Sequence, residues 1–236
     1  MPIVVSKATK QYNEMIQENL AAIAATIPQG TRLVAVSKTK PVEMVQEAYD
    51  AGQRLFGENY ATELRDKYPL LPKDIEWHFI GHLQPKQLKY YIGFVTMIHG
   101  VDSVEHLLEV EKAAAKVGRV VDVLLQVHVA AEETKFGFVP EELEALHTIP
   151  QLEHVRVRGV MGMATATDDM EQVRREFRRI HAIYDTLRQG FFASQPTFNE
   201  ISMGMSHDYR IAIEEGATLV RIGSSIFGPR NYSKQQ

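Results

Sequence analysis

Cysteine is absent from the 236-residue sequence, which excludes disulfide bonds, thiolate metal ligands and a cysteine nucleophile. Basic residues are not in excess, because 26 lysines and arginines stand against 30 aspartates and glutamates. Nucleic-acid binding would need a positively charged surface, so we expect no such role. The sequence also lacks an apolar run of membrane-spanning length, since the patch "LAAIAATI" is too short and follows glutamates rather than a cationic segment. These absences favour a cytoplasmic protein without a membrane anchor.

Hydrophobic residues make up 44% of the chain, which is enough for one sizeable core. Short apolar segments alternate with longer amphipathic ones, and continuous apolar segments are typical of parallel strands buried on both faces. Strands are predicted at 33–37, 55–57, 77–80, 95–98, 120–129, 155–160, 198–202 and 219–222. Helices are predicted at 42–51, 104–117, 141–146, 170–187 and 208–215, with a weaker one after the third strand.

This alternation predicts an α/β fold, a single TIM (β/α)8 barrel that forms one domain over residues 1–236. An extra N-terminal helix within residues 1–30 would pack on the barrel. Gly52 and Gly216 each follow a helix and precede a strand, where a left-handed cap is expected, and Pro41 is placed at a first helical position. Periodicity does not distinguish this barrel from an open doubly wound sheet, which is the alternative.

Active sites of such barrels lie at the carboxyl ends of the strands, and two segments there are typical of phosphate sites. The segment "SMGMSHD", after the seventh strand, supplies Gly204 and a predicted helix N-cap at Ser206. The segment "RIGSS", at the eighth strand, supplies Gly223 and Ser224, with backbone N–H groups and hydroxyls that could bind an anion. Gly-Ser pairs are also common in plain turns, which is the alternative interpretation.

Lys38 ends the first predicted strand and shares the parity of Val36, so both side chains should point to the same side of the sheet. A partly desolvated lysine in a barrel mouth could attack a carbonyl carbon. Opposite a phosphate site, such an amine indicates either a pyridoxal phosphate site or an aldolase that forms a Schiff base with a sugar phosphate. Arg221 shares its side with Gly223 and could face a pyridine nitrogen, or it could pair with a barrel carboxylate such as Glu58.

The motifs "AVSKTKP", "FGENY", "WHFIG", "RGVMGMA", "SMGMSHD" and "VRIGSSIFG" together resemble the pyridoxal phosphate homeostasis (YggS/PROSC) family, in its order and over most of the chain. The resemblance implies the barrel of the alanine racemase N-terminal domain, without that enzyme's second domain. It also implies a pyridoxal 5'-phosphate cofactor held as an aldimine on Lys38, with Asn59 close to the ring and Arg221 at the pyridine nitrogen. The implied phosphate-binding residues are Gly204, Ser206, Gly223 and Ser224.

Two segments depart from the family pattern. The segment "HLQPKQ" has Lys86 and Gln87 where the family usually has Asn-Lys, and His128 replaces an asparagine after the fifth strand. Lys135 and Gly137 still match the family's Lys-x-Gly. Both departures lie outside the lysine and phosphate motifs, so cofactor binding is still expected, and the departures bear on surface or secondary-site functions.

The resemblance implies a cofactor carrier in intracellular pyridoxal phosphate homeostasis rather than an enzyme, with no catalytic residue assigned. A weak amino-acid racemase activity is the alternative, for which Tyr60 or His78 would have to supply a second acid/base group beside Lys38. His78 is otherwise given a packing or supporting role. No metal site is predicted, because the sequence contains no His-Glu-x-x-His motif. We expect a monomer whose partners would include acceptor apo-enzymes.

Overall fold

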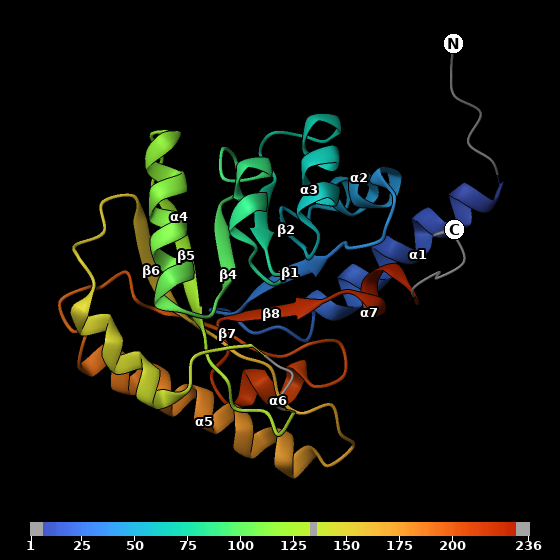
Figure 1. Ribbon diagram of the computed structural model, residues 1–236. Helices are drawn as coiled ribbons and strands as arrows, with labels where there is room; N and C mark the ends of the chain where they lie inside the picture. Colours follow the sequence, from blue (N-terminus) through green and yellow to red (C-terminus); the bar gives the residue numbers. More distant parts are fainter. Residues whose placement is uncertain (1–6, 133–135, 230–236) are drawn as a thin grey trace.

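The computed structural model describes residues 7–132 and 136–229 and contains a closed barrel of parallel strands in the order β1 to β8 (Figure 1). The strands are β1 Arg32–Val36, β2 Leu55–Glu58, β3 Glu76–Phe79, β4 Met97–Val101, β5 Val121–Gln126, β6 Val155–Met161, β7 Glu200–Ser202 and β8 Leu219–Ile222. β1 pairs with β8, from Arg32 opposite Leu219 to Ala35 opposite Ile222, and this pairing closes the sheet. The predicted barrel is confirmed, and the open-sheet alternative is wrong.

Helices cover the outside of the barrel, with α4 and α5 flanking β4 to β6 in Figure 1. The helices are α1 Lys7–Ala24, α2 Val42–Asp50, α3 Ala61–Lys67, α4 Val104–Lys116, α5 Met170–Gln189, α6 Tyr209–Glu214 and α7 Ser224–Phe227, with 3-10 helices η1 Tyr68–Leu70, η2 Pro85–Tyr90 and η3 Pro140–Thr148. α1 packs against α2 and α7 and buries Ile16, Leu20 and Ile23, which confirms the extra N-terminal helix. Within the described ranges, no helix is both long and apolar enough to cross a membrane.

Local hydrogen bonds shift some of the predicted strand boundaries. The fourth strand begins at Met97 rather than at Val95, because the Val95 N–H donates to a turn carbonyl at 2.9 Å. The fifth strand ends at Gln126 rather than at residue 129, because the His128 N–H leaves the sheet and donates to the Phe138 carbonyl at 2.9 Å. These corrections come from contacts that apolar patterning does not encode.

Two predicted helix features are also corrected. The segment 141–146 belongs to the 3-10 helix η3, whose turns close over three residues, as in the 3.0 Å bond from the Glu142 N–H to the Val139 carbonyl. Pro41 stands one position before the first helical residue, because its ψ of 160° is extended. The predicted left-handed caps are confirmed, with φ of 100° at Gly52 and 94° at Gly216.

The barrel interior contains an apolar cluster and a set of buried polar side chains. The apolar cluster consists of Val34, Leu55, Met97, Leu124, Met161 and Leu219. Further inward-facing positions are occupied by His78, His99, Ser202 and Arg221, because the residues before them, Trp77, Ile98, Ile201 and Val220, belong to the outer core between sheet and helices. A polar barrel interior is costly unless its groups are paired, so these four side chains are candidates for function.

An ion-pair network joins strands at the amino-terminal end of the barrel. Glu200 accepts hydrogen bonds from Arg32 at 2.7 Å and from the Thr218 hydroxyl at 2.6 Å. Asp122 accepts from Arg156 at 2.6 Å and from Arg158 at 2.7 Å. Because this end lies opposite the mouth where chemistry occurs in such barrels, the network is assigned to stability.

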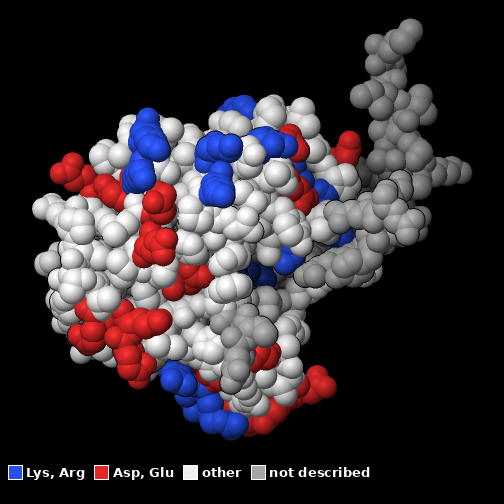
Figure 2. All heavy atoms as spheres, in the orientation of Figure 1, with Lys and Arg blue, Asp and Glu red and all other residues white. Residues whose placement is uncertain are grey.

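Charges of both signs are interspersed on the face shown in Figure 2. Arginines of α5 form ion pairs with two glutamates at the end of α6. Arg174 contacts Glu214 and Glu215 at 2.6 Å each, and Arg178 contacts Glu215 at 3.0 Å. These arginines therefore form part of a mixed, solvated helix surface.

Candidate functional site

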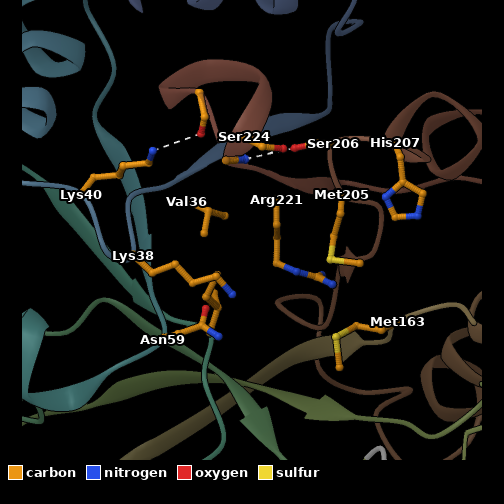
Figure 3. A pocket seen from close by; sticks show the side chains of 13 residues that line it. Val36, Lys38, Lys40, Asn59, Met163, Met205, Ser206, His207, Arg221 and Ser224 are labelled. Carbon is orange, nitrogen blue, oxygen red and sulfur yellow. Dashed lines mark hydrogen bonds between the residues drawn. The ribbon is translucent and has the colours of Figure 1, made fainter. Parts of the chain in front are cut away.

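A cavity of about 340 Å³ opens at the carboxyl ends of the strands, where the sequence predicts the site (Figure 3). Its lining residues are Val36, Lys38, Lys40, Asn59, Ile80, Met163, Met205, Ser206, His207, Arg221, Gly223, Ser224 and Gly228. Every predicted site residue except Gly204 lines this one cavity. The volume is within the range of pockets that hold small-molecule ligands.

A tight turn positions Lys38 at the cavity. The Lys40 N–H donates to the Ser37 carbonyl at 3.1 Å, so residues 37–40 form a four-residue turn directly after β1. Thr39, at the third position, has a φ of 60°, a conformation that is strained for a β-branched residue. The turn places Lys38 on the same side as Val36, and its side chain extends to the side chain of Asn59 in Figure 3.

Asn59 enters the cavity from the end of β2, and a glycine just after the next strand makes room for it. A Cβ at Gly81 would lie 2.0 Å from the Asn59 carbonyl oxygen, a distance that no real side chain tolerates. The end of β3 can therefore approach the backbone at Asn59 only because residue 81 lacks a side chain.

The two predicted phosphate segments meet across the cavity. The Gly223 N–H donates to the Ser206 hydroxyl oxygen at 3.3 Å, and Gly223 is the N-cap of α7, which begins at Ser224. The predicted N-cap role of Ser206 is wrong, because Asp208 stands before α6 and its carboxylate accepts from the Met205 N–H at 2.5 Å. The Ser206 hydroxyl therefore contacts Gly223, just after β8, and not the helix.

Gly204 supports the site without lining it. Its φ is 90°, and a Cβ there would lie 2.5 Å from the Ala212 Cβ, so the glycine allows the loop after β7 to pack on α6. The Gly204 carbonyl accepts from the Arg221 N–H at 3.0 Å, which ties the loop to β8.

Arg221 lies buried in the wall of the cavity, with only 5% of its surface exposed. It donates to the Ser202 hydroxyl at 2.7 Å and to the Gly162 carbonyl at 3.1 Å. The alternative pairing with Glu58 is wrong, because Glu58 forms its ion pair with Lys67. Burial lowers the pKa of Arg221 to about 10, so the guanidinium is still charged at neutral pH. Arg221 thus presents a desolvated donor to anything bound in the cavity.

A line of buried polar groups continues from Arg221 into the barrel. The Nδ1 atom of His99 lies 3.0 Å from the Ser202 hydroxyl, and its Nε2 atom lies 2.8 Å from Nδ1 of His78. Burial lowers the pKa of His78 to about 3 and the pKa of His99 well below its ordinary value, so both imidazoles are neutral. Because Arg221 can only donate, Ser202 accepts from it and can donate its own hydrogen to His99.

Sequence reasoning missed several lining residues. Lys40 lies beyond the predicted first strand, yet it lines the cavity, and its amine donates to the carbonyls of Phe227 and Gly228 at 3.0 Å each. Met163 and Met205 face the cavity in Figure 3, and both lie within motifs already quoted. Parity along the strands could not find them, since they lie in loops. His207, the remaining polar residue, has its imidazole 3.2 Å from the carboxylate of Asp208.

The segments that depart from the family pattern lie away from the cavity lining. Lys86 and Gln87 belong to η2. The His128 imidazole lies 3.0 Å from the Glu132 carbonyl. Lys135 lies outside the described residues, and Gly137, with a φ of 144°, packs on the backbone of His128.

Comparisons with known proteins first define the class of barrel. Residues 13–231 match the family described as "Alanine racemase, N-terminal domain". The alanine racemase of Bartonella henselae superposes with a TM-score of 0.68 at 17% identity, over 94% of this chain and 61% of that enzyme. At this identity the likeness shows the fold alone.

The curated relatives are more specific. The pyridoxal phosphate homeostasis protein of Aquifex aeolicus is 43% identical over 204 residues, which cover 85% of this chain and 88% of that protein. The human protein of the same name is 37% identical over 252 residues, covering 98% and 88%. PipY of Synechococcus elongatus, solved with pyridoxal phosphate bound, has a TM-score of 0.83 and 34% identity, over 90% of this chain and all of that one. The chain therefore belongs to the pyridoxal phosphate homeostasis protein family.

Proposed function

We propose that this protein binds pyridoxal 5'-phosphate reversibly through Lys38 and acts in its intracellular homeostasis as a carrier rather than as an enzyme. The observation that carries the proposal is the convergence of three features in one cavity: the Lys38 amine, the buried guanidinium of Arg221, and the Ser206–Gly223–Ser224 cluster. The names of the curated relatives and the ligand of PipY support the same ligand. The protein would act as a cytoplasmic monomer that hands the cofactor to apo-enzymes.

The side chains fit the chemistry of this ligand. Pyridoxal phosphate supplies an aldehyde, which condenses reversibly with a primary amine and releases water. Lys38 supplies the amine for this reaction, since the amine of Lys40 donates to the carbonyls of Phe227 and Gly228, and Asn59 beside Lys38 would orient the ring. The Ser206 and Ser224 hydroxyls would bind the phosphate, together with the backbone N–H groups at the start of α7, which have no acceptor within the helix. Gly204 would contribute through the loop that it shapes.

Arg221 supports a carrier more than an enzyme. A guanidinium with a pKa of about 10 donates a hydrogen bond but keeps its proton at neutral pH, so it would hold a pyridine nitrogen unprotonated. An unprotonated ring is a weaker electron sink than a pyridinium whose N–H is held by an aspartate carboxylate. Racemisation also needs a second acid/base group, yet neither Tyr60, which is 54% exposed, nor the buried His78 lines the cavity.

We expect the wild-type protein mixed with pyridoxal phosphate to become yellow and to retain a pyridoxyl mass on the Lys38 peptide after borohydride reduction. The Lys38→Ala variant should lose the colour and the added mass, while its affinity falls only about tenfold to a hundredfold because the phosphate contacts remain. Absorbance titration and peptide mass mapping provide the measurements.

Lys116→Ala, a change at the exposed last turn of α4, is the matched control and should behave as wild type. A wild-type protein that gains no pyridoxyl mass on the Lys38 peptide with excess pyridoxal phosphate would refute the proposal. Efficient racemisation of a free amino acid by the yellow protein would overturn the carrier assignment in favour of the enzyme.

A further inference from the structure

A buried ion pair lies behind the cavity, outside its lining. Lys67, at the end of α3, is 4% exposed, and Glu58, at the end of β2, is fully buried. The Lys67 amine donates to Glu58 at 2.7 Å and to Glu63 at 2.6 Å. Burial raises the pKa of Glu58 to about 7, against the lowering effect of Lys67, so the site penalises the charged carboxylate. Buried ion pairs seldom stabilise a fold more than apolar residues would, so this one needs another reason.

Ser37 links this ion pair to the residues in front of it. The Ser37 hydroxyl donates to the same Glu58 oxygen at 2.6 Å, and the Ser37 carbonyl accepts from the Lys67 amine at 2.8 Å. The same carbonyl accepts from the Lys40 N–H and so closes the turn that carries Lys38. Three hydrogen bonds therefore fix the residue immediately before the proposed ligand-binding lysine.

Glu58 precedes Asn59 in the sequence, just as Ser37 precedes Lys38. It is the last residue of β2, and Asn59 follows it directly. The cluster thus holds the chain one residue before Lys38 and one residue before Asn59, just beyond the last pairing of β1 with β2, where Val36 lies opposite Gly57. A side chain from α3 completes the cluster, so the outer helix helps to define the distance between the two cavity residues.

We propose that Ser37, Glu58 and Lys67 form a positioning cluster that holds Lys38 and Asn59 in register for the ligand. The inference rests on the proposed function and adds residues that touch no ligand themselves. Lys67 acts only through Ser37 and Glu58, and the cluster explains why a costly ion pair is buried at this end of the barrel. It sets the geometry of the amine, not the affinity for phosphate, because Ser206, Gly223 and Ser224 follow β7 and β8 and accept or donate none of the hydrogen bonds of the cluster.

The test is the double variant Glu58→Gln, Lys67→Met, which removes both charges and keeps similar side-chain volumes. Its melting temperature should stay within about 4 °C of wild type, because a neutral replacement of a whole buried ion pair costs little. Its dissociation constant for pyridoxal phosphate should rise about tenfold, and the rate of covalent linkage to Lys38 should fall by at least as much. Its affinity for inorganic phosphate, measured by calorimetry, should match that of wild type.

Asp122→Asn at the other end of the barrel is the stability control. It should lower the melting temperature by about 4 °C or more and leave ligand affinity within about twofold of wild type. If the double variant does not fold, Ser37→Ala gives the test, since it removes only the hydroxyl bond and should slow the linkage in the same direction. Wild-type affinity and linkage rate in the folded variants would overturn the positioning role. A wild-type protein that forms no linkage would instead refute the proposed function, and the inference with it.

Discussion

Pyridoxal, which lacks the phosphate group, should bind about a thousandfold more weakly than pyridoxal phosphate. A phosphate held by Ser206, Gly223 and Ser224 gains charge-assisted hydrogen bonds worth about 1.5 kcal/mol or more each. The loss of three such bonds corresponds to about 4.5 kcal/mol, which is roughly a thousandfold in the dissociation constant. The ring is unchanged, and the free 5'-hydroxyl of pyridoxal closes reversibly on the aldehyde as a hemiacetal, so Lys38 can still react with pyridoxal, but only at high concentration.

Absorbance titrations of both compounds measure this ratio directly. The double variant Ser206→Ala, Ser224→Ala is the matched comparison, because it removes two hydroxyl donors and leaves the backbone N–H groups. It should lose affinity for pyridoxal phosphate by about a hundredfold or more and leave the weak affinity for pyridoxal unchanged. Equal affinities of the wild-type protein for the two compounds would show that the phosphate is held elsewhere.

Strand parity explains why several site residues could be predicted. Side chains alternate across a strand. Lys38 is therefore expected on the same side as Val36, and Arg221 on the same inner side as Leu219. The ends of β7 and β8 are neighbours in a closed barrel, which brought Ser206 and Gly223 within hydrogen-bonding distance. These predictions used only alternation and the order of the strands.

Contacts between distant segments explain what could not be predicted. Ser206 and Asp208 are both good N-cap residues, and the chain enters α6 at Asp208, whose carboxylate accepts from the Met205 N–H instead of from the helix. Lys67 has the sequence pattern of an exposed helical lysine, yet it is buried because the ends of β1 and β2 lie beneath α3. The Lys40 amine donates to the Phe227 carbonyl, which is 187 residues further along the sequence. Periodicity holds no information on such pairings.

Acidification should destabilise the fold well above the pH at which ordinary carboxylates titrate. The folded-state pKa of His78 is about 3 and that of His99 is well below its ordinary value, both because of burial, whereas the unfolded chain takes up these protons near pH 6.5. The stability that the two neutral histidines contribute is therefore complete above pH 6.5 and is lost as the pH falls. Each histidine lowers the free energy of unfolding by about 1.4 kcal/mol for every pH unit below 6.5.

Glu58 acts in the opposite direction within part of this window. Its folded-state pKa is raised to about 7 by burial, so between pH 7 and about 4.5 the folded protein holds a proton that the unfolded chain has released. Lowering the pH through this interval stabilises the fold by about as much as one histidine destabilises it. The free energy of unfolding should then fall by about 1.4 kcal/mol per pH unit down to pH 4.5, because the unfolded chain takes up a net one proton more than the folded protein.

Urea unfolding at pH 7, 6 and 5 separates the two contributions, because the free energy of unfolding is compared within each variant. His99→Gln should flatten the pH dependence, since only one buried imidazole then remains against Glu58. The Glu58→Gln, Lys67→Met double variant should steepen it to about 2.7 kcal/mol per pH unit, since both histidines then act unopposed. Equal slopes in all three proteins would mean that His99 and Glu58 take up no protons differently in the folded and unfolded states, and the buried polar line beneath Arg221 would then not be neutral.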